Sequence, residues 1–162
     1  MAQFEDLTQL LPVAPILTSK QANWKNFFLA NYQHPASECE HTIDHHILEV
    51  IEPNSRSHHE RRMDGKYLSS EIRGGEVFLC PAHTKHWVTW EKSLNFTVLV
   101  FDASFLKQIA DEMGNISQIE ITSQWNIFDP LIQNLVKALK TDPEDGSPAG
   151  RYQSSFMGMR CS

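Results

Sequence analysis

The chain has 162 residues, enough for one domain with a hydrophobic core of its own. Its 41% hydrophobic and 21% charged residues are ordinary for a globular protein. A net charge of −6 argues against direct binding of nucleic acid, because duplex-binding surfaces are usually basic.

The three cysteines, Cys39, Cys80 and Cys161, are too few and too scattered for a disulfide framework, and no CxxC pair is present. The N-terminal residues lack the basic start and apolar run of a secretory signal. No stretch reaches the ~20 apolar residues that a membrane-spanning helix needs. We therefore expect a cytoplasmic protein with no membrane partner.

Strands are predicted over residues 24–101, after an N-terminal segment (1–23) of mixed character to which we assign no fold. This region carries short apolar or alternating runs with turn signals between them. The predicted strands are NFFLANY, HHILEVI, HHERRM, KYLSSEI, EVFLC, HWVTW and FTVLVF. The pair Asp64-Gly65 suits a tight hairpin whose central residues need positive φ. Many short strands at close spacing predict an antiparallel sandwich or barrel.

Helical patterns follow the strands, and we predict a helical extension over residues 102–140 that packs on the barrel. The run DASFLKQIADEMG places Phe105, Ile109 and Met113 on one helical face. QIEITSQW is a further candidate strand inside this region. Residues 141–162 are expected to form a polar linker and a truncated terminal helix.

The clearest predicted helix is DPLIQNLVKALK, where Asp129 can cap the first turn and Pro130 fits its first position. The helix has an apolar stripe, of which Leu131, Leu135 and Leu139 are expected to be core, and a surplus apolar face would support dimerisation. The stripe consists of Leu131, Ile132, Leu135, Val136 and Leu139.

The hairpin GGEVFLCPAHTKHWVTW, from Gly74 to Trp90, resembles the second conserved motif of the cupins. That motif has Gly, then Pro six residues later, Gly two beyond, His three further and Asn four after that. Gly75, Pro81 and His86 match, whereas His83 and Trp90 replace the second Gly and the Asn. The resemblance implies a mostly β fold: a cupin-like antiparallel barrel of jelly-roll type, followed by two or three C-terminal helices.

Residues of about 34–155 resemble, more narrowly, the N-terminal sensor domain of AraC-type transcriptional regulators. The segments that carry this resemblance are HHILEVIEP, RMDGK, the hairpin, LNFTVLVFDASFLKQIADE and DPLIQNLVKAL. That family joins a cupin-like barrel and helices to a region with two helix-turn-helix motifs, for which too few residues follow here. The resemblance implies a homodimeric sensor domain without its DNA-binding part, which binds an unknown small-molecule effector.

A metal-dependent cupin enzyme, of dioxygenase or isomerase type, is the alternative. Cupin enzymes bind a divalent metal through three histidines and a carboxylate. Aligned with the first cupin motif, CEHTIDHHILEVIEP puts Cys39 and His41 at the two His places and His46 at the Glu place. Together with His86, these residues could bind Zn, Fe, Mn or Ni. We expect no metal, because only His41 keeps the consensus ligand of that motif.

The predicted ligand-binding residues are His46, His86 and Trp90, with His41 next. His86 and Trp90 share one face of a strand, which would look into the barrel. The pair His58-His59 is expected in solvent at a strand end, and His83 in an exposed loop. We predict no catalytic residues and favour a protein that is not an enzyme, since the sequence has no nucleophile–base pair, paired carboxylates or phosphate-binding glycine loop.

Overall fold

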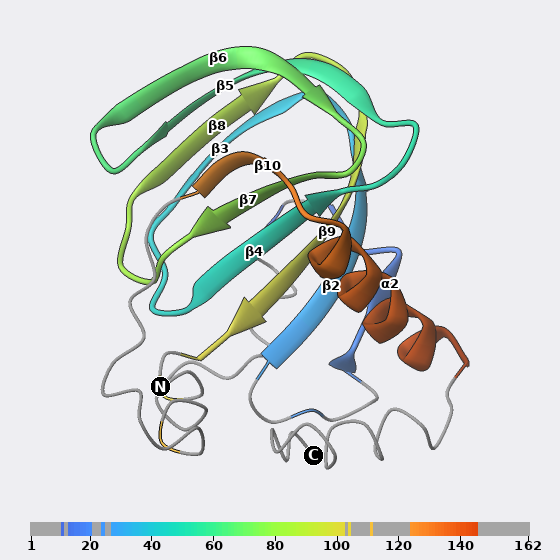
Figure 1. Cartoon of the computed structure of the whole chain (residues 1–162). Helices are drawn as coiled ribbons and strands as arrows, with labels where there is room; N and C mark the ends of the chain where they lie inside the picture. The colour runs from blue at the N-terminus through green and yellow to red at the C-terminus, as the bar shows by residue number, and fades with distance from the viewer. Residues whose placement is uncertain are drawn as a thin grey trace.

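The computed structural model describes residues 11, 13–20, 24, 27–102, 104, 111 and 124–145. Their elements, in chain order, are β1 (Leu17–Thr18), β2 (Phe27–His34), β3 (Ser37–His41), β4 (His46–Ile51), β5 (Arg56–Met63), β6 (Lys66–Arg73), β7 (Glu76–Cys80), β8 (His86–Trp90), β9 (Leu94–Phe101), β10 (Gln124–Phe128) and α2 (Pro130–Asp145) (Figure 1). None of the helices among these residues is long and apolar enough to cross a bilayer.

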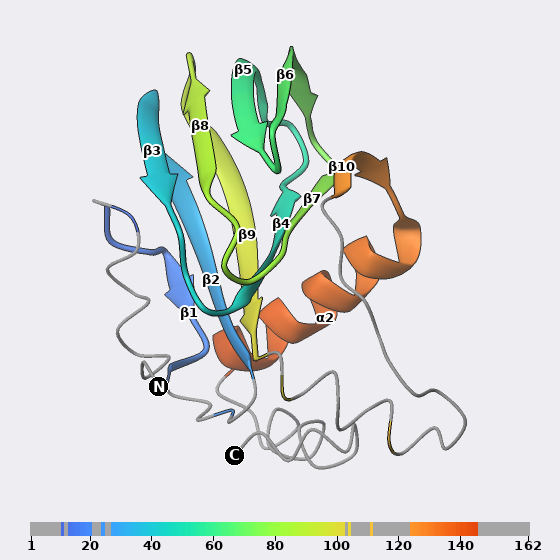
Figure 2. The ribbon, with the colours of Figure 1, turned by 90° about the vertical axis from the view of Figure 1, so that its left-hand side faces the viewer.

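The strands form two antiparallel sheets that lie face to face (Figures 1 and 2). One sheet has the order β1-β2-β9-β4-β7-β10 and the other the order β3-β8-β5-β6. Without the outer strands β1 and β10, each sheet keeps four strands, and the chain passes between the sheets as in an eight-stranded jelly roll. The predicted fold class is confirmed by this strand order.

Period-two alternation explains which residues face the space between the sheets. On β2, Phe28, Ala30 and Tyr32 join the central core, whereas Phe27 and Leu29 pack on the opposite face. The six-stranded sheet is therefore buried on both sides, which accounts for the continuous apolar runs of β2, β4 and β9. The four-stranded sheet alternates between buried and more exposed positions, because its outer face meets solvent.

Two turns have the backbone conformation that their residues predict. Asp64 and Gly65 have φ of 58° and 73°, as the tight β5–β6 hairpin requires. His83 stands at the glycine place of the cupin motif and also has a positive φ, 66°. The loop after Pro81 thus keeps a left-handed residue even though the glycine is absent.

Helix α2 begins as predicted, because Asp129 Oδ1 accepts hydrogen bonds from the backbone N–H groups of Leu131 (2.9 Å) and Ile132 (3.4 Å). The assignment of Leu131 and Leu135 to the core was wrong, whereas that of Leu139 was right. Val136 and Leu139 are buried against the six-stranded sheet, but Leu131 is 76% exposed and Leu135 39% exposed. The stripe is wider than the contact that one sheet face offers to one helix.

Residues 102–140 also contain a strand, because β10 pairs with β7 at the edge of the six-stranded sheet. Helix α2 then continues to Asp145, five residues into the segment predicted as linker. Most of the helix predicted over residues 102–114 lies outside the described residues, where only Asp102, Ser104 and Asp111 are placed. Among the described residues α2 is the one helix with defined bounds, fewer than the two or three predicted.

Candidate functional site

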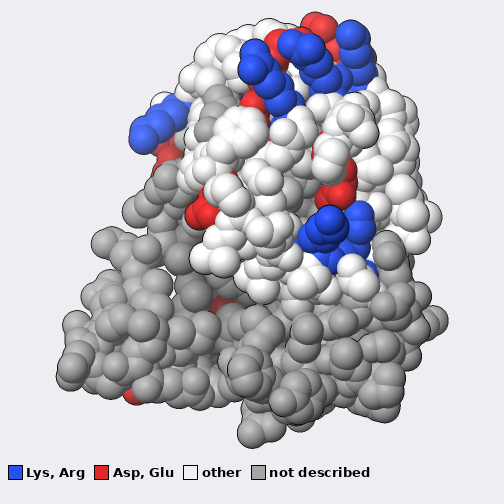
Figure 3. All heavy atoms as spheres, turned by 45° about the vertical axis from the view of Figure 1, so that its right-hand side comes forward, with Lys and Arg blue, Asp and Glu red and all other residues white. Residues whose placement is uncertain are grey.

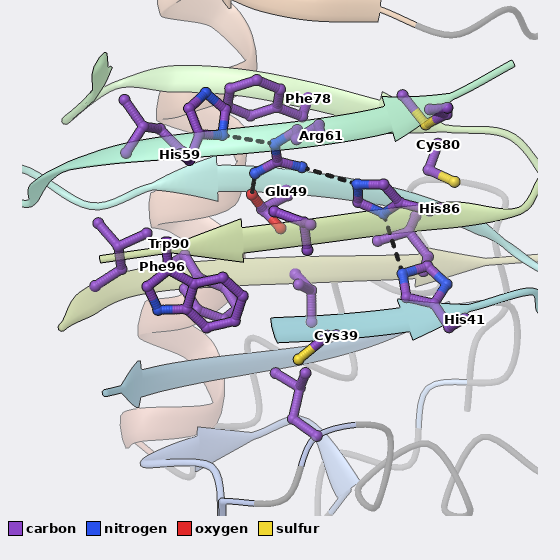
Figure 4. Close-up of a pocket in the computed structure, with 17 residues that line it drawn as sticks. Cys39, His41, Glu49, His59, Arg61, Phe78, Cys80, His86, Trp90 and Phe96 are labelled. Carbon is purple, nitrogen blue, oxygen red and sulfur yellow. Dashed lines mark hydrogen bonds and ion pairs between the residues drawn. The ribbon is translucent and has the colours of Figure 1, made fainter. Parts of the chain in front are cut away.

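A cavity of about 50 Å³ lies between the two sheets. Aliphatic side chains and the aromatic rings of Phe78, Trp90 and Phe96 form most of its wall (Figure 4). The polar residues that line it come from β3, β4, β5, β7 and β8: Cys39, His41, Glu49, His59, Arg61, Cys80 and His86. A few water molecules would fill this volume.

Arg61 is the centre of the polar cluster. It lies on β5, is 2% exposed, and shares the inward face of its strand with His59. Its guanidinium donates from Nη2 to Glu49 Oε1 at 2.5 Å, from Nε to His59 Nδ1 at 3.0 Å and from Nη1 to His86 Nε2 at 3.2 Å. The Phe78 ring centroid lies 3.9 Å from Cζ, close enough for a cation–π contact. A charge that would be costly to bury is thereby paired and hydrogen-bonded.

Arg61 also determines where the histidine protons lie. Because a guanidinium has only donors, His59 Nδ1 and His86 Nε2 must both accept. The proton of His59 is then on Nε2, which lies 3.1 Å from Ser70 Oγ, and the proton of His86 is on Nδ1, 3.1 Å from His41 Nε2. The proton of His41 is left on Nδ1, which is buried and has no hydrogen-bond partner in the part of the chain that the structure describes.

Burial keeps this cluster free of further charge. Desolvation, together with the nearby Arg61 charge, lowers the pKa of His86 to about 2 and the pKa of His59 to about 3. Burial lowers the pKa of His41 as well. The pKa values of the two thiols in the cavity change in the opposite direction. Burial raises the pKa of Cys80 to about 12 and also raises the pKa of Cys39. At neutral pH the histidines are therefore uncharged and the thiols protonated.

The structure brings three of the four predicted ligand-binding residues to the cavity: His41, His86 and Trp90. His46 is not among the cavity residues, because Ile47 and Glu49 occupy the inward face of β4 and His46 occupies the other. Its Nδ1 accepts a hydrogen bond from the Ala82 N–H at 2.9 Å. His46 thus fixes the β7–β8 loop.

The sequence interpretation missed Glu49, His59 and Arg61. The pair His58-His59 was expected in solvent, and for His59 this was wrong, because it is 1% exposed. The signal that would have found it is the alternation of His59 and Arg61 with the apolar Met63 at one end of β5. His83 lies in an exposed loop as predicted.

The divalent metal of cupin enzymes does not fit these residues. The lone pairs of His59 Nδ1, His86 Nε2 and Glu49 Oε1 all meet the permanently charged guanidinium of Arg61. A metal ion would have to displace one fixed cation and would compete with it for the same three acceptors. Among the described residues, no group of three or more His, Cys, Asp or Glu side chains could hold an ion, so the set Cys39, His41, His46 and His86 is not assembled.

Comparisons with known proteins find similarity to solved structures, over part of the chain, but no similarity in sequence searches. No protein-family model matches the sequence, and no curated protein matches it. The Clostridium difficile EutQ protein aligns with 48% of this chain at 13% identity and a TM-score of 0.39, and the match covers 58% of EutQ. A Cupin 2 conserved barrel domain protein from Salinispora arenicola matches at 17% identity over 53% of this chain and 70% of its own, with a TM-score of 0.36. Bacillus subtilis oxalate decarboxylase matches at 15% identity over 68% of this chain and 36% of its own, with a TM-score of 0.40.

The fold is a cupin-like jelly roll. This assignment depends on the strand order of the two sheets. Structural similarities with TM-scores and identities this low support no conclusion about family or activity. The chain spans a little over half of EutQ and about a third of the decarboxylase, so the activities of those proteins are not transferred to it.

Proposed function

We propose that this chain is a cytoplasmic effector-binding and dimerisation domain of the kind found in AraC-type regulators, without DNA-binding activity of its own. The observation that supports the proposal best is the cavity between the two sheets, whose polar residues hydrogen-bond to one another around Arg61. Such a lining provides a bound ligand with a complementary shape, an apolar surface and a small number of fixed polar groups.

The same residues give little support to catalysis. Nucleophilic cysteines need a lowered pKa, whereas burial raises the pKa of both Cys39 and Cys80. A general base needs a pKa near the working pH, whereas that of His86 is lowered to about 2. We therefore favour ligand binding over catalysis as the function of this cavity.

Ligand binding is tested by thermal unfolding against a panel of small acids, sugars and alcohols. A compound at one hundred times its Kd adds about 2.7 kcal/mol to folded-state stability, which raises Tm by roughly 5–10 °C in a domain of this size. The matched control is the double variant Val88→Ile with Val98→Ile, which adds bulk to the cavity wall without changing its charge. A panel that shifts neither protein, or shifts both equally, would count against a ligand in the barrel.

Dimerisation through α2 and Phe128, the last residue of β10, is the second part of the proposal. Phe128 is 60% exposed, and Leu131 and Leu135, one turn apart on α2, are 76% and 39% exposed, so large apolar side chains face solvent here. On the side of the molecule that comes forward in Figure 3, charged residues gather at the upper rim and in a second cluster lower on the right, and uncharged surface lies between them. A two-fold homodimer is the default arrangement for such a surface.

The double variant Leu131→Glu with Leu135→Glu is expected to be a monomer at concentrations where the unchanged chain is a dimer. Two carboxylates would be buried without partners at the proposed interface. Light scattering after size-exclusion chromatography measures the molar mass. Lys137→Glu, an exposed position on the same helix, is the control and should leave the mass unchanged. Equal masses for all three proteins would remove α2 from the interface.

A further inference from the structure

The lining of the cavity carries no net charge. Its one permanent cation, Arg61, is paired with its one carboxylate, Glu49, at 2.5 Å. The three histidines of the cluster are neutral donors and acceptors in a fixed order, and the thiols of Cys39 and Cys80 are protonated. A charged ligand would therefore introduce a buried charge for which the lining holds no free partner.

Glu49 is the polar group best placed to contact a ligand. Its side chain is 16% exposed, against 3% for Arg61. The carboxylate receives the Arg61 hydrogen bond on Oε1, and a carboxylate has about four lone-pair sites in all. Figure 4 shows Glu49 between Arg61 above it and the rings of Trp90 and Phe96 below. A hydrogen-bond donor in the cavity would thus meet a carboxylate oxygen on one side and aromatic surface on the other.

The volume of the cavity and its apolar wall limit the size and chemistry of the ligand further. The cavity volume of about 50 Å³ is well below the ~150 Å³ of a cavity that accommodates benzene. Apart from the polar cluster, the wall consists of aliphatic and aromatic side chains, among them Val88, Leu94 and Val98. These surfaces suit a short hydrocarbon chain and offer no second set of polar contacts.

We infer that the effector of this cavity is a small neutral molecule, an apolar body with one hydroxyl group that donates to Glu49. This inference rests on the proposed function, since it names the class of effector that the same site takes. An amine would donate to Glu49 equally well, but its ammonium charge would be unpaired next to Arg61. A carboxylic acid would bring a second anion against Glu49.

Three ligands of similar size but different charge test this inference: neutral 1-propanol, anionic propionate and cationic propylammonium. We expect 1-propanol to bind the unchanged protein at least tenfold more tightly than either ion at pH 7. NMR titration gives the three Kd values, and NOEs from the ligand methyl group to the Trp90 indole locate the binding in the cavity. Tighter binding of propionate or propylammonium would overturn the inference while leaving the proposed function intact.

The other outcomes are equally decisive. If none of the three binds but a larger compound of the panel does, the inference about size and class is wrong and the proposed function stands. If no compound binds, so that the cavity holds water only, both fail. All these measurements use the unchanged chain, so they do not depend on whether any variant folds.

Glu49→Gln provides the sharper test where it folds. The amide keeps the shape of the side chain but leaves Arg61 without its counter-charge, so the cavity becomes cationic. We expect propionate to bind this variant at least tenfold more tightly than it binds the unchanged chain, and 1-propanol to lose its preference. Glu91→Gln, the same change at an exposed position after β8, should leave all three affinities unchanged. Identical ligand rankings in both variants would contradict the charge argument.

Discussion

Replacing Arg61 with methionine is expected to lower the free energy of unfolding by about 3–5 kcal/mol at pH 7, the usual cost of removing one partner of a buried ion pair. Methionine can fill much of the space beside Phe78, but it cannot donate to Glu49. The lone pairs of His59 Nδ1 and His86 Nε2 would also lose their donors. Urea unfolding followed by circular dichroism measures the change.

Two comparisons isolate the charge effect in this experiment. Adding Glu49→Gln to Arg61→Met removes the unpaired carboxylate, so the double variant is expected to recover a substantial part of the lost stability. Arg62→Met tests the neighbouring arginine on the outer face of β5, whose guanidinium lies 5.0 Å from the Trp87 ring centroid. Its loss should cost no more than about 1 kcal/mol, as for exposed cation–π contacts. Similar losses at positions 61 and 62 would show that Arg61 does not organise the core.

Local patterns in the sequence predicted β2 and β4–β9, but not β3, which completes the four-stranded sheet of the jelly roll. Alternation, apolar runs and turn residues such as Asp64-Gly65 are short-range signals, and the structure contains the strands that they predicted. The β8 face of His86, Val88 and Trp90 was predicted correctly from the same period of two. The edge strand β10 was harder to place, because five residues with one partner strand leave a weak pattern.

The centre of the site was missed because long-range pairing creates it. Glu49 and Arg61 lie on different sheets, and nothing in their local sequence indicates that the two strands face each other. The run HHERRM is polar up to Met63, so the burial of His59 and Arg61 depends on a register fixed by β6 and β8. His46 shows the opposite error: a motif alignment placed it inside, but the inward face of β4 belongs to the odd-numbered residues.

The polar lining of the cavity is organised around Arg61. Two imidazoles and a carboxylate each accept a hydrogen bond from a different nitrogen of its guanidinium. The cluster then supplies stability and a fixed hydrogen-bond pattern rather than an open coordination position.

The free energy of unfolding is expected to fall steeply as the pH drops below 6.5. The folded state holds His86 and His59 neutral, with pKa values of about 2 and about 3, whereas both titrate near 6.5 in the unfolded chain. Between those limits the unfolded state binds more protons, so stability rises with pH and is lost on acidification. Each histidine contributes a slope that approaches about 1.4 kcal/mol per pH unit well below pH 6.5, so the pair accounts for a loss of about 3 kcal/mol between pH 6.5 and 5.

Urea unfolding at half-unit steps from pH 7.5 to 5 measures this slope. His86→Gln removes one titrating group and should reduce the slope by about 1.4 kcal/mol per pH unit, whatever its effect on absolute stability. His58→Gln, on the outer face of β5, is the matched control for the loss of an imidazole. Burial raises the pKa of Glu76, which acts with the opposite sign, but this contribution is common to all three proteins and cancels in the comparison. An unchanged slope in His86→Gln would mean that the imidazole of His86 is not held neutral inside the barrel, and the neutral lining inferred for the cavity would fail with it.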